Sequence, residues 1–202
     1  MKDIKRVGLL TGGGDCPGLN AVIRAVVKTL SLKHAIQVIG FEDGFEGLIE
    51  NRSRPLSYDD ASGILQLGGT ILGTSNKANP FNQAIKQDGQ IVKKDVSAQT
   101  LENISRHRLD ALVCIGGDGT MTISRQLIEK GVPVVGVPKT IDNDLYGTDV
   151  TFGFDTAMTT AAMAIDYIHT TAQSHHRIML VEIMGRYAGW LTLSAVIAGG
   201  AD

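Results

Sequence analysis

The stretch from residue 111 to residue 144 decides the fold, and it contains ALVCIGGDGT (111–120) and VPVVGVPKTIDND (132–144). Each pattern is a short apolar run that leads into a polar loop. The apolar run 111–115 does not alternate with polar residues, which is typical of a parallel strand covered on both faces. The second pattern predicts another buried strand of the same kind.

Outside these loops, strands and helices alternate along the chain. We expect a second buried strand over 134–137, ended by Pro138, and an irregular surface excursion over 79–95. Strands are also expected over 7–10, 37–41 and 178–183, and helices over 58–67, 97–107, 121–130, 155–171 and 186–198, with a further helix starting at Leu19. This alternation predicts an α/β fold, a mostly parallel sheet with helices on both faces. No repeat, low-complexity tract or linker interrupts it, so we predict no domain boundary.

The loop GGDGT offers a phosphate-binding geometry. Gly116, Gly117 and Gly119 allow a phosphate to approach the main chain, and the following helix presents unpaired N–H groups at its N-terminus. Asp118 is well placed to hold a metal ion against the same phosphate. The alternative is an ordinary strand-to-helix turn with an Asp cap.

The loop PKTIDND should lie at the same, carboxyl end of the sheet, where ligands bind in open α/β folds. Asp142 and Asp144 can divide their work there: one accepts a proton from a hydroxyl while the other supports the metal or the first carboxylate. A solvated turn is the alternative, because Asp and Asn are favoured turn residues.

A second glycine run, TGGGDCPG (11–18), follows the first strand and leads into a helix. This is again the geometry of a phosphate cradle, although it fits neither the Walker pattern nor GxGxxG. Asp15 either touches the ligand or orients the loop, and the sequence leaves both open.

The composition describes a globular chain. With 202 residues, 43% hydrophobic and 20% charged, it can bury a core of single-domain size. A net charge of -2 gives no general attraction to nucleic acid or to an anionic membrane. The two cysteines indicate no disulfide framework, and no 18-residue apolar segment predicts a membrane span, so we expect a cytoplasmic protein.

Five motifs together resemble the 6-phosphofructokinase family, in order and in approximate spacing. They are TGGGDCPGLN (11–20), GGTILG (68–73), GGDGT (116–120), PKTIDND (138–144) and MGR (184–186). GGDGT also occurs in kinases of NAD or lipids, whereas PKTIDND and MGR together are highly specific. The resemblance implies a three-layer, Rossmann-type fold and transfer of a phosphoryl group from ATP to the 1-hydroxyl of fructose 6-phosphate, with Mg²⁺.

The resemblance also implies roles for individual residues. Asp142 would be the base, Asp144 would support it or the metal, and Arg186 would neutralise developing charge. Thr140 would contact the transferred phosphoryl group or the sugar, and Lys139 would contact the phosphate product. The nucleotide would be bound by Gly13, Gly14, Lys77, Gly116, Gly117, Asp118, Gly119 and Thr120, with Asp118 organising the magnesium. The sugar phosphate would be bound by Thr140, Asp142, Arg177, Met184, Gly185 and Arg186.

Arg177 and Arg186 flank the expected strand 178–183, too far apart to serve one phosphate within one subunit. In the family, the counterpart of Arg177 reaches a neighbouring subunit's sugar-phosphate site. The resemblance therefore implies a homo-oligomer, a dimer or a tetramer, with shared active sites. Family subunits also continue beyond this length, so we interpret residues 1–202 as the nucleotide-side portion of a longer subunit.

The phosphoryl donor is the point on which the sequence is divided. Pyrophosphate-using relatives typically have aspartate at the position of Gly119, but they also have lysine at the position of Lys139. Lys77 stands near the position of an arginine in familiar bacterial enzymes and cannot offer a guanidinium fork. We expect ATP, because Gly119 leaves the nucleotide's space open. The alternatives are a pyrophosphate-dependent enzyme and a non-catalytic nucleotide-binding or regulatory subunit.

Overall fold

The structure is a computed structural model that describes residues 3–87 and 89–202. The chain forms two compact units, the first ending at Pro138 and the second starting at Lys139. The division falls inside a strand, where the sequence offers no linker.

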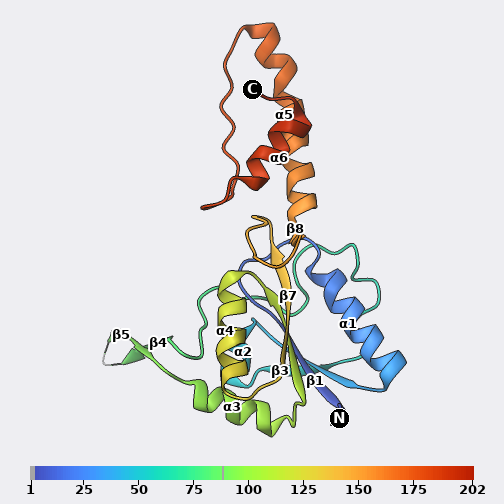
Figure 1. Cartoon of the computed structure of the whole chain (residues 1–202), viewed down its shortest axis with the longest axis vertical. Helices are drawn as coiled ribbons and strands as arrows, with labels where there is room; N and C mark the ends of the chain where they lie inside the picture. The colour runs from blue at the N-terminus through green and yellow to red at the C-terminus, as the bar shows by residue number, and fades with distance from the viewer. Residues whose placement is uncertain (1–2, 88) are drawn as a thin grey trace. The chain divides into compact units, whose positions relative to one another are not determined.

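The first unit is built on a mostly parallel sheet with strand order β3-β2-β1-β6-β7 (Figure 1). Strands β1 (Arg6–Thr11), β2 (Gln37–Phe41), β6 (Ala111–Gly116) and β7 (Val134–Thr140) run parallel. The edge strand β3 (Ser53–Leu56) runs antiparallel to β2. The predicted α/β fold is therefore confirmed.

Helices cover both faces of this sheet. Helix α1 (Leu19–His34) covers one face, and α2 (Phe45–Glu50), α3 (Ser97–Arg106) and α4 (Asp118–Glu129) cover the other (Figure 1). Successive residues of β1 enter different cores, since Leu9 packs with the α1 side and Leu10 with the opposite side. Two hydrophobic cores thus share one sheet.

The central strands are buried as predicted, but β7 is not. Leu112, Cys114 and Ile115 of β6 are fully buried, whereas Val135 of β7 is 59% exposed. Among the residues that the structure describes, β7 up to Pro138 pairs with β6 on one side and with no strand on the other. Pro138 does not end the strand either, which continues to Thr140. An edge position tolerates the missing proline N–H, so both predictions for this strand were wrong for the same reason.

Two surface segments of the first unit also differ from prediction. Residues 58–67 form turns and bends, not a helix, and Gly63 within them has a φ of 73°, outside the helical region. Residues 79–95, predicted irregular, contain the antiparallel hairpin of β4 (Gln83–Gln87) and β5 (Gln90–Lys94). The strands QAIKQ and QIVKK are too polar to show a clear alternation of apolar and polar residues, so the sequence did not predict them.

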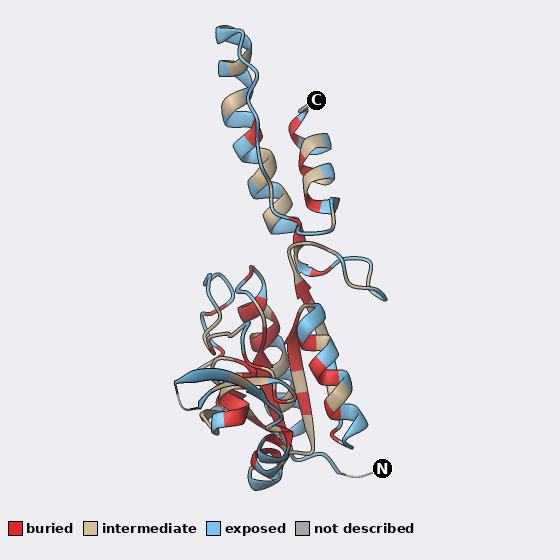
Figure 2. Cartoon of the chain, turned by 90° about the vertical axis from the view of Figure 1, so that its left-hand side faces the viewer, coloured by how far each residue is buried: buried red, intermediate tan, exposed pale blue. Residues whose placement is uncertain are grey.

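The second unit consists mainly of two helices. The end of β7 pairs with β8 (Phe152–Gly153), which leads directly into α5 (Phe154–His175). Helix α6 (Trp190–Gly199) packs closely on α5, since a Cβ on Gly199 would lie 3.0 Å from the Ile165 side chain. Most of α5 is only partly buried or exposed (Figure 2).

The predicted strand 178–183 is absent. Ile178 and Leu180 are exposed, and no regular structure is assigned between residues 177 and 185. A strand requires a hydrogen-bonding neighbour, and the described part of this unit supplies none there. Helix α6 also begins at Trp190 and not at residue 186, after a turn at Gly185. Within the described ranges, no helix has the length and apolarity needed to cross a membrane.

Helix α4 provides a matched test of the core. Leu127 is fully buried and its neighbour Ile128 is 51% exposed. Leu127→Ala should lower the free energy of unfolding by about 2–5 kcal/mol, because it leaves a cavity in the core. Ile128→Ala should change it by less than about 1 kcal/mol. Denaturant unfolding of both variants would measure this, and equal losses would contradict the assigned packing.

Candidate functional site

Three loops meet at the carboxyl end of β1 and β6 in the first unit. The Gly12 N–H donates to the Ile115 carbonyl (2.8 Å), and the Gly13 N–H donates to the Ser75 carbonyl (3.1 Å). The Thr11 hydroxyl donates to the Gly73 carbonyl (2.6 Å). The structure thus brings the first glycine run beside the end of β6 and beside the loop that carries Lys77.

Polar side chains of the first glycine run and of α1 hold the loop 67–75 in place. The Asn20 amide donates to the carbonyls of Leu67 (2.9 Å) and Gly69 (2.7 Å), and its oxygen accepts the Ile71 N–H (2.9 Å). Asp15 accepts the Thr70 N–H at 3.0 Å, which supports loop orientation as its role. Sequence reasoning missed Asn20, although a buried Asn at a helix start is a signal for such bonding.

The side chain of Thr120 is the reason that two positions in the glycine loops must be glycine. Its side chain is 5% exposed, and a Cβ on either Gly12 or Gly116 would collide with it. The threonine therefore fills the space between the two glycine loops. With its side chain occupied in this way, a contact of Thr120 with a phosphate would have to come from its backbone N–H.

The start of α4 is open to solvent. Gly117 is its N-cap, Asp118 is its first residue, and both Asp118 and Gly119 are exposed. A Cβ on Gly119 would meet no atom within 4 Å, and the same holds for exposed Gly14. Free helix N–H groups beside glycines suit a phosphate. The exposed Lys77 belongs to the adjoining loop and can add a positive charge.

A metal ion at this site would depend on the ligand. Within residues 3–87 and 89–202, no group of three or more His, Cys, Asp or Glu side chains could hold a metal ion. Asp118 supplies a single exposed carboxylate. Mg²⁺ commonly binds through one or two carboxylates together with phosphate oxygens and water, so the donor set fits Mg²⁺ carried with a nucleotide.

In the second unit, the loop after β7 groups two carboxylates with an arginine. Asp142 is half-buried, and Asp144 is exposed. Burial and the neighbouring charge of Asp144 raise the pKa of Asp142, while the charge of Arg186 lowers it. A carboxylate with a raised pKa binds a proton more strongly, as a general base must. The Asp142 N–H donates to the Thr140 hydroxyl at 3.2 Å.

Asn143 and Thr151 organise this loop, and sequence reasoning assigned neither. The Asn143 side-chain oxygen accepts the Thr151 N–H (2.9 Å), and the Thr151 hydroxyl donates to the Thr140 carbonyl (2.6 Å). Asn143 lies in the left-handed region with φ 50°. An Asn between two Asp residues was the available signal, because Asn tolerates that region better than most residues.

The other predicted residues of this unit differ in exposure. Lys139 is 3% exposed and Gly185 is buried, whereas Met184, Arg177 and Arg186 are exposed. Gly185 forms a tight turn with Ala188, whose N–H donates to its carbonyl at 2.8 Å, and a Cβ there would collide with the Ala188 oxygen. The Arg186 guanidinium carbon lies 4.8 Å from the Tyr187 ring centre. Arg177 follows the end of α5, and its N–H donates to the Ala172 carbonyl.

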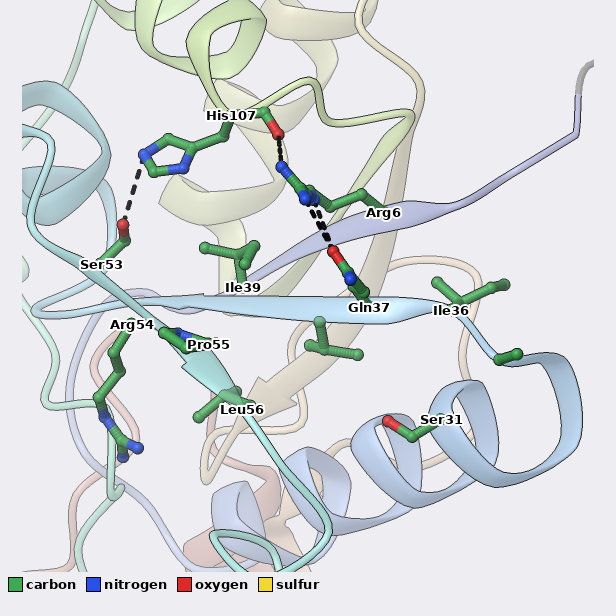
Figure 3. A pocket seen from close by; sticks show the side chains of 12 residues that line it. Arg6, Ser31, Ile36, Gln37, Ile39, Ser53, Arg54, Pro55, Leu56 and His107 are labelled. Carbon is green, nitrogen blue, oxygen red and sulfur yellow. Dashed lines mark hydrogen bonds between the residues drawn. The ribbon is translucent and has the colours of Figure 1, made fainter.

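The hollow in Figure 3 is a different place. Its volume is about 640 Å³, and it is lined by residues that include Arg6, Gln37, Ser53 and His107. Arg6 and Gln37 begin β1 and β2, so the hollow lies at the opposite strand ends from the glycine loops. The Arg6 guanidinium already donates to the Gln37 side chain (2.7 Å) and to the His107 carbonyl (2.9 Å). The polar groups of Arg6, Gln37 and His107 that line the hollow are therefore engaged in hydrogen bonds that stabilise the fold.

Known proteins resemble this chain over its whole length. It is 58% identical to an ATP-dependent 6-phosphofructokinase 2 of Clostridium perfringens, covering 100% of this chain and 56% of that protein. It is 52% identical to a pyrophosphate–fructose 6-phosphate 1-phosphotransferase of Amycolatopsis methanolica, covering 98% and 54%. The crystal structure of Pichia pastoris phosphofructokinase in the T-state superposes with a TM-score of 0.85 at 33% identity, covering 100% and 22%.

The chain spans about half the length of the curated relatives it matches. The sequence model of the family described as Phosphofructokinase matches residues 6–202. These residues include both glycine loops, the Asp142 loop and the Gly185 turn. The chain therefore belongs to the phosphofructokinase family.

Proposed function

We propose that this chain is the nucleotide-side portion of an enzyme that transfers the γ-phosphoryl group of ATP to the 1-hydroxyl of fructose 6-phosphate, with Mg²⁺. The observation that carries the proposal is 58% identity, over the whole chain, to a protein named ATP-dependent 6-phosphofructokinase 2. The same proposal includes a glycolytic role in the cytoplasm. It also includes a homo-oligomer in which Arg177 completes a neighbour's sugar-phosphate site.

Each unit has its own part in this reaction. The loop of Gly13 and Gly14 lies along the phosphates of the nucleotide, and the backbone N–H groups of residues 117–120 receive them, with Lys77 adding charge. Gly13 lines the phosphates without donating its N–H, which is bonded to the Ser75 carbonyl. Mg²⁺, held by Asp118 and the phosphates, would neutralise phosphate charge. Asp118 is exposed and has room to reach a ligand.

Asp142 accepts the proton of the sugar hydroxyl. Its raised pKa makes it a stronger base than an ordinary aspartate, and Asp144 contributes to that rise. Arg186 balances the two carboxylates and neutralises charge that develops on the transferred group. Thr140 contacts the phosphoryl group or the sugar, Lys139 the phosphate product, and Met184 and Gly185 the sugar.

Pyrophosphate is the second candidate donor, because a relative named for pyrophosphate is 52% identical to this chain. Lys139 favours the same reading, as a lysine there suits a pyrophosphate or phosphate product. Gly119 favours ATP. The space beside it is open, and glycine has no side chain that would collide with a nucleotide phosphate or repel its charge. Initial rates of the full-length enzyme with ATP and with pyrophosphate, at saturating fructose 6-phosphate, would decide between them.

Asp142→Asn tests the base. It should lower kcat by roughly 10² to 10⁴, because the amide cannot accept the proton, with little change in the KM for ATP. Steady-state kinetics of the full-length enzyme measures both constants. A variant with the wild-type kcat would remove Asp142 from the mechanism.

Asp144→Asn tests how the base is tuned. Activity requires ionised Asp142, so kcat/KM falls as the pH drops through the pKa of Asp142. Because the charge of Asp144 raises that pKa, its removal should move the acid limb of the profile to lower pH. The measurement is the pH at the midpoint of the acid limb in a profile of kcat/KM against pH, and not the maximal value of kcat/KM.

Asp149→Asn is the control, since Asp149 is exposed on the same loop and is not among the groups that shift the pKa of Asp142. An acid limb that moves upward in Asp144→Asn, or equally in both variants, would contradict the assigned coupling.

Gly119→Asp tests the donor. A carboxylate beside a nucleotide phosphate at about 4 Å costs roughly 1 kcal/mol even in water, so kcat/KM for ATP should fall by about fivefold or more. Gly119→Asn has the same size without the charge and should retain more of the ATP activity. Equal activity of the wild type and Gly119→Asp with ATP would show that Gly119 does not select the donor.

A further inference from the structure

The loop between β7 and β8 is held by hydrogen bonds that its own side chains make within the loop and to the end of β7. Thr151 is 2% exposed, although most residues around it are accessible. Its hydroxyl donates to the carbonyl of Thr140, the last residue of β7, at 2.6 Å. This bond ties the end of the loop to its beginning.

A second bond ties the end of the loop to its middle. The Thr151 N–H donates to the Asn143 side-chain oxygen at 2.9 Å, and the Asn143 amide approaches the Asp149 carbonyl at 3.4 Å. Asn143 stands between Asp142 and Asp144, and its φ of 50° reverses the local chain direction. The side chain of Asn143 therefore fixes the backbone between the two carboxylate residues.

The strand end is connected to the base itself. The Thr140 hydroxyl accepts the Asp142 N–H at 3.2 Å, so Thr151, Thr140 and Asp142 form one continuous series of contacts. Both hydrogen bonds are partly buried, so water competes for them less than for exposed ones.

We propose that Thr151 and Asn143 are positioning residues that hold Asp142 in place for proton transfer. This inference rests on the proposed function. Neither residue needs to touch the substrate, since both act through the backbone of Thr140 and of the loop. Displacement of a reacting group by about 1 Å can reduce a rate by roughly 10²-fold, which is the scale at which such a clamp matters.

Two variants remove different parts of this set of bonds. Thr151→Val keeps the shape and the backbone N–H but deletes the hydroxyl bond to Thr140 and the longer one (3.4 Å) to the Asn143 side-chain oxygen. Asn143→Gly deletes the side-chain acceptor while keeping a residue that adopts positive φ without strain. Each should lower kcat of the full-length enzyme by about 10- to 100-fold and leave the KM for ATP unchanged.

Two further variants serve as controls. Thr151→Ser retains the hydroxyl and should restore kcat. Thr148→Val removes another hydroxyl of the same loop, one that donates to the nearby Val150 carbonyl (3.0 Å), and it should leave kcat unchanged. A general loss of folding would affect both constants or all variants, whereas this pattern isolates the clamp.

Hydrogen–deuterium exchange of the full-length protein, read by mass spectrometry on peptides covering 139–152, tests the clamp without activity. Exchange should be about tenfold faster in Thr151→Val and Asn143→Gly, and unchanged in Thr151→Ser and Thr148→Val. Unchanged exchange in the first two variants would overturn the inference. So would faster exchange with an undiminished kcat, or a Thr151→Ser variant as slow as Thr151→Val.

If the wild-type enzyme phosphorylates fructose 6-phosphate with neither donor, the proposed function fails and exchange alone judges the clamp. Faster exchange in Thr151→Val than in Thr148→Val would then retain the clamp as an organiser of the carboxylate loop. Equal exchange would reject it. If Thr151→Val does not fold, Asn143→Gly carries the same comparison.

Discussion

The packing of Thr120 against two glycines is the constraint on which the first unit depends. Its buried side chain occupies the space that Cβ atoms on Gly12 and Gly116 would need. The loop after β1 can therefore approach the turn after β6 closely enough for the Gly12 N–H to reach the Ile115 carbonyl at 2.8 Å. With the two loops joined in this way, the start of α4 and the first glycine run belong to one surface.

The polar residues around that surface divide into those that build it and those left accessible. Asn20, Asp15 and Thr11 use their side chains on the loop 67–75, so they are committed to the scaffold. Gly14 and Gly119 have open space where a side chain would stand. A ligand can thus approach the main chain at these two glycines without meeting a side chain.

The sequence predicted the central part of the fold because burial leaves a local trace. The apolar runs ending at Leu10 and Ile115 lie in strands covered on both faces, and such strands need no partner information to be recognised. Val135 and residues 178–183 have similar apolar character, but their environment depends on which strand lies beside them. An edge strand and an unpaired segment cannot be told from a central strand by composition.

The residues of the candidate site also divide into those that the local sequence predicts and those that depend on distant parts of the chain. Asp118, Gly119 and Asp142 belong to contiguous motifs, so their placement at the ends of strands was predictable. Asn20 and Thr151 were not, because their partners lie about 50 and 11 residues away in the chain. Their value comes from loop geometry that only the folded backbone reveals.

The hairpin of β4 and β5 has a consequence for how this family can change. The Val96 N–H donates to the Pro80 carbonyl at 2.7 Å, and Phe81 and Val96 pack on the core, so the base of the hairpin is fixed. Beyond that base, Lys86, Ile91 and Lys93 face solvent and make no contribution to either core. The two strands can therefore be lengthened, shortened or substituted in the course of evolution without disturbing the central sheet. For the same reason, a fluorescent label or a short affinity tag can be introduced there.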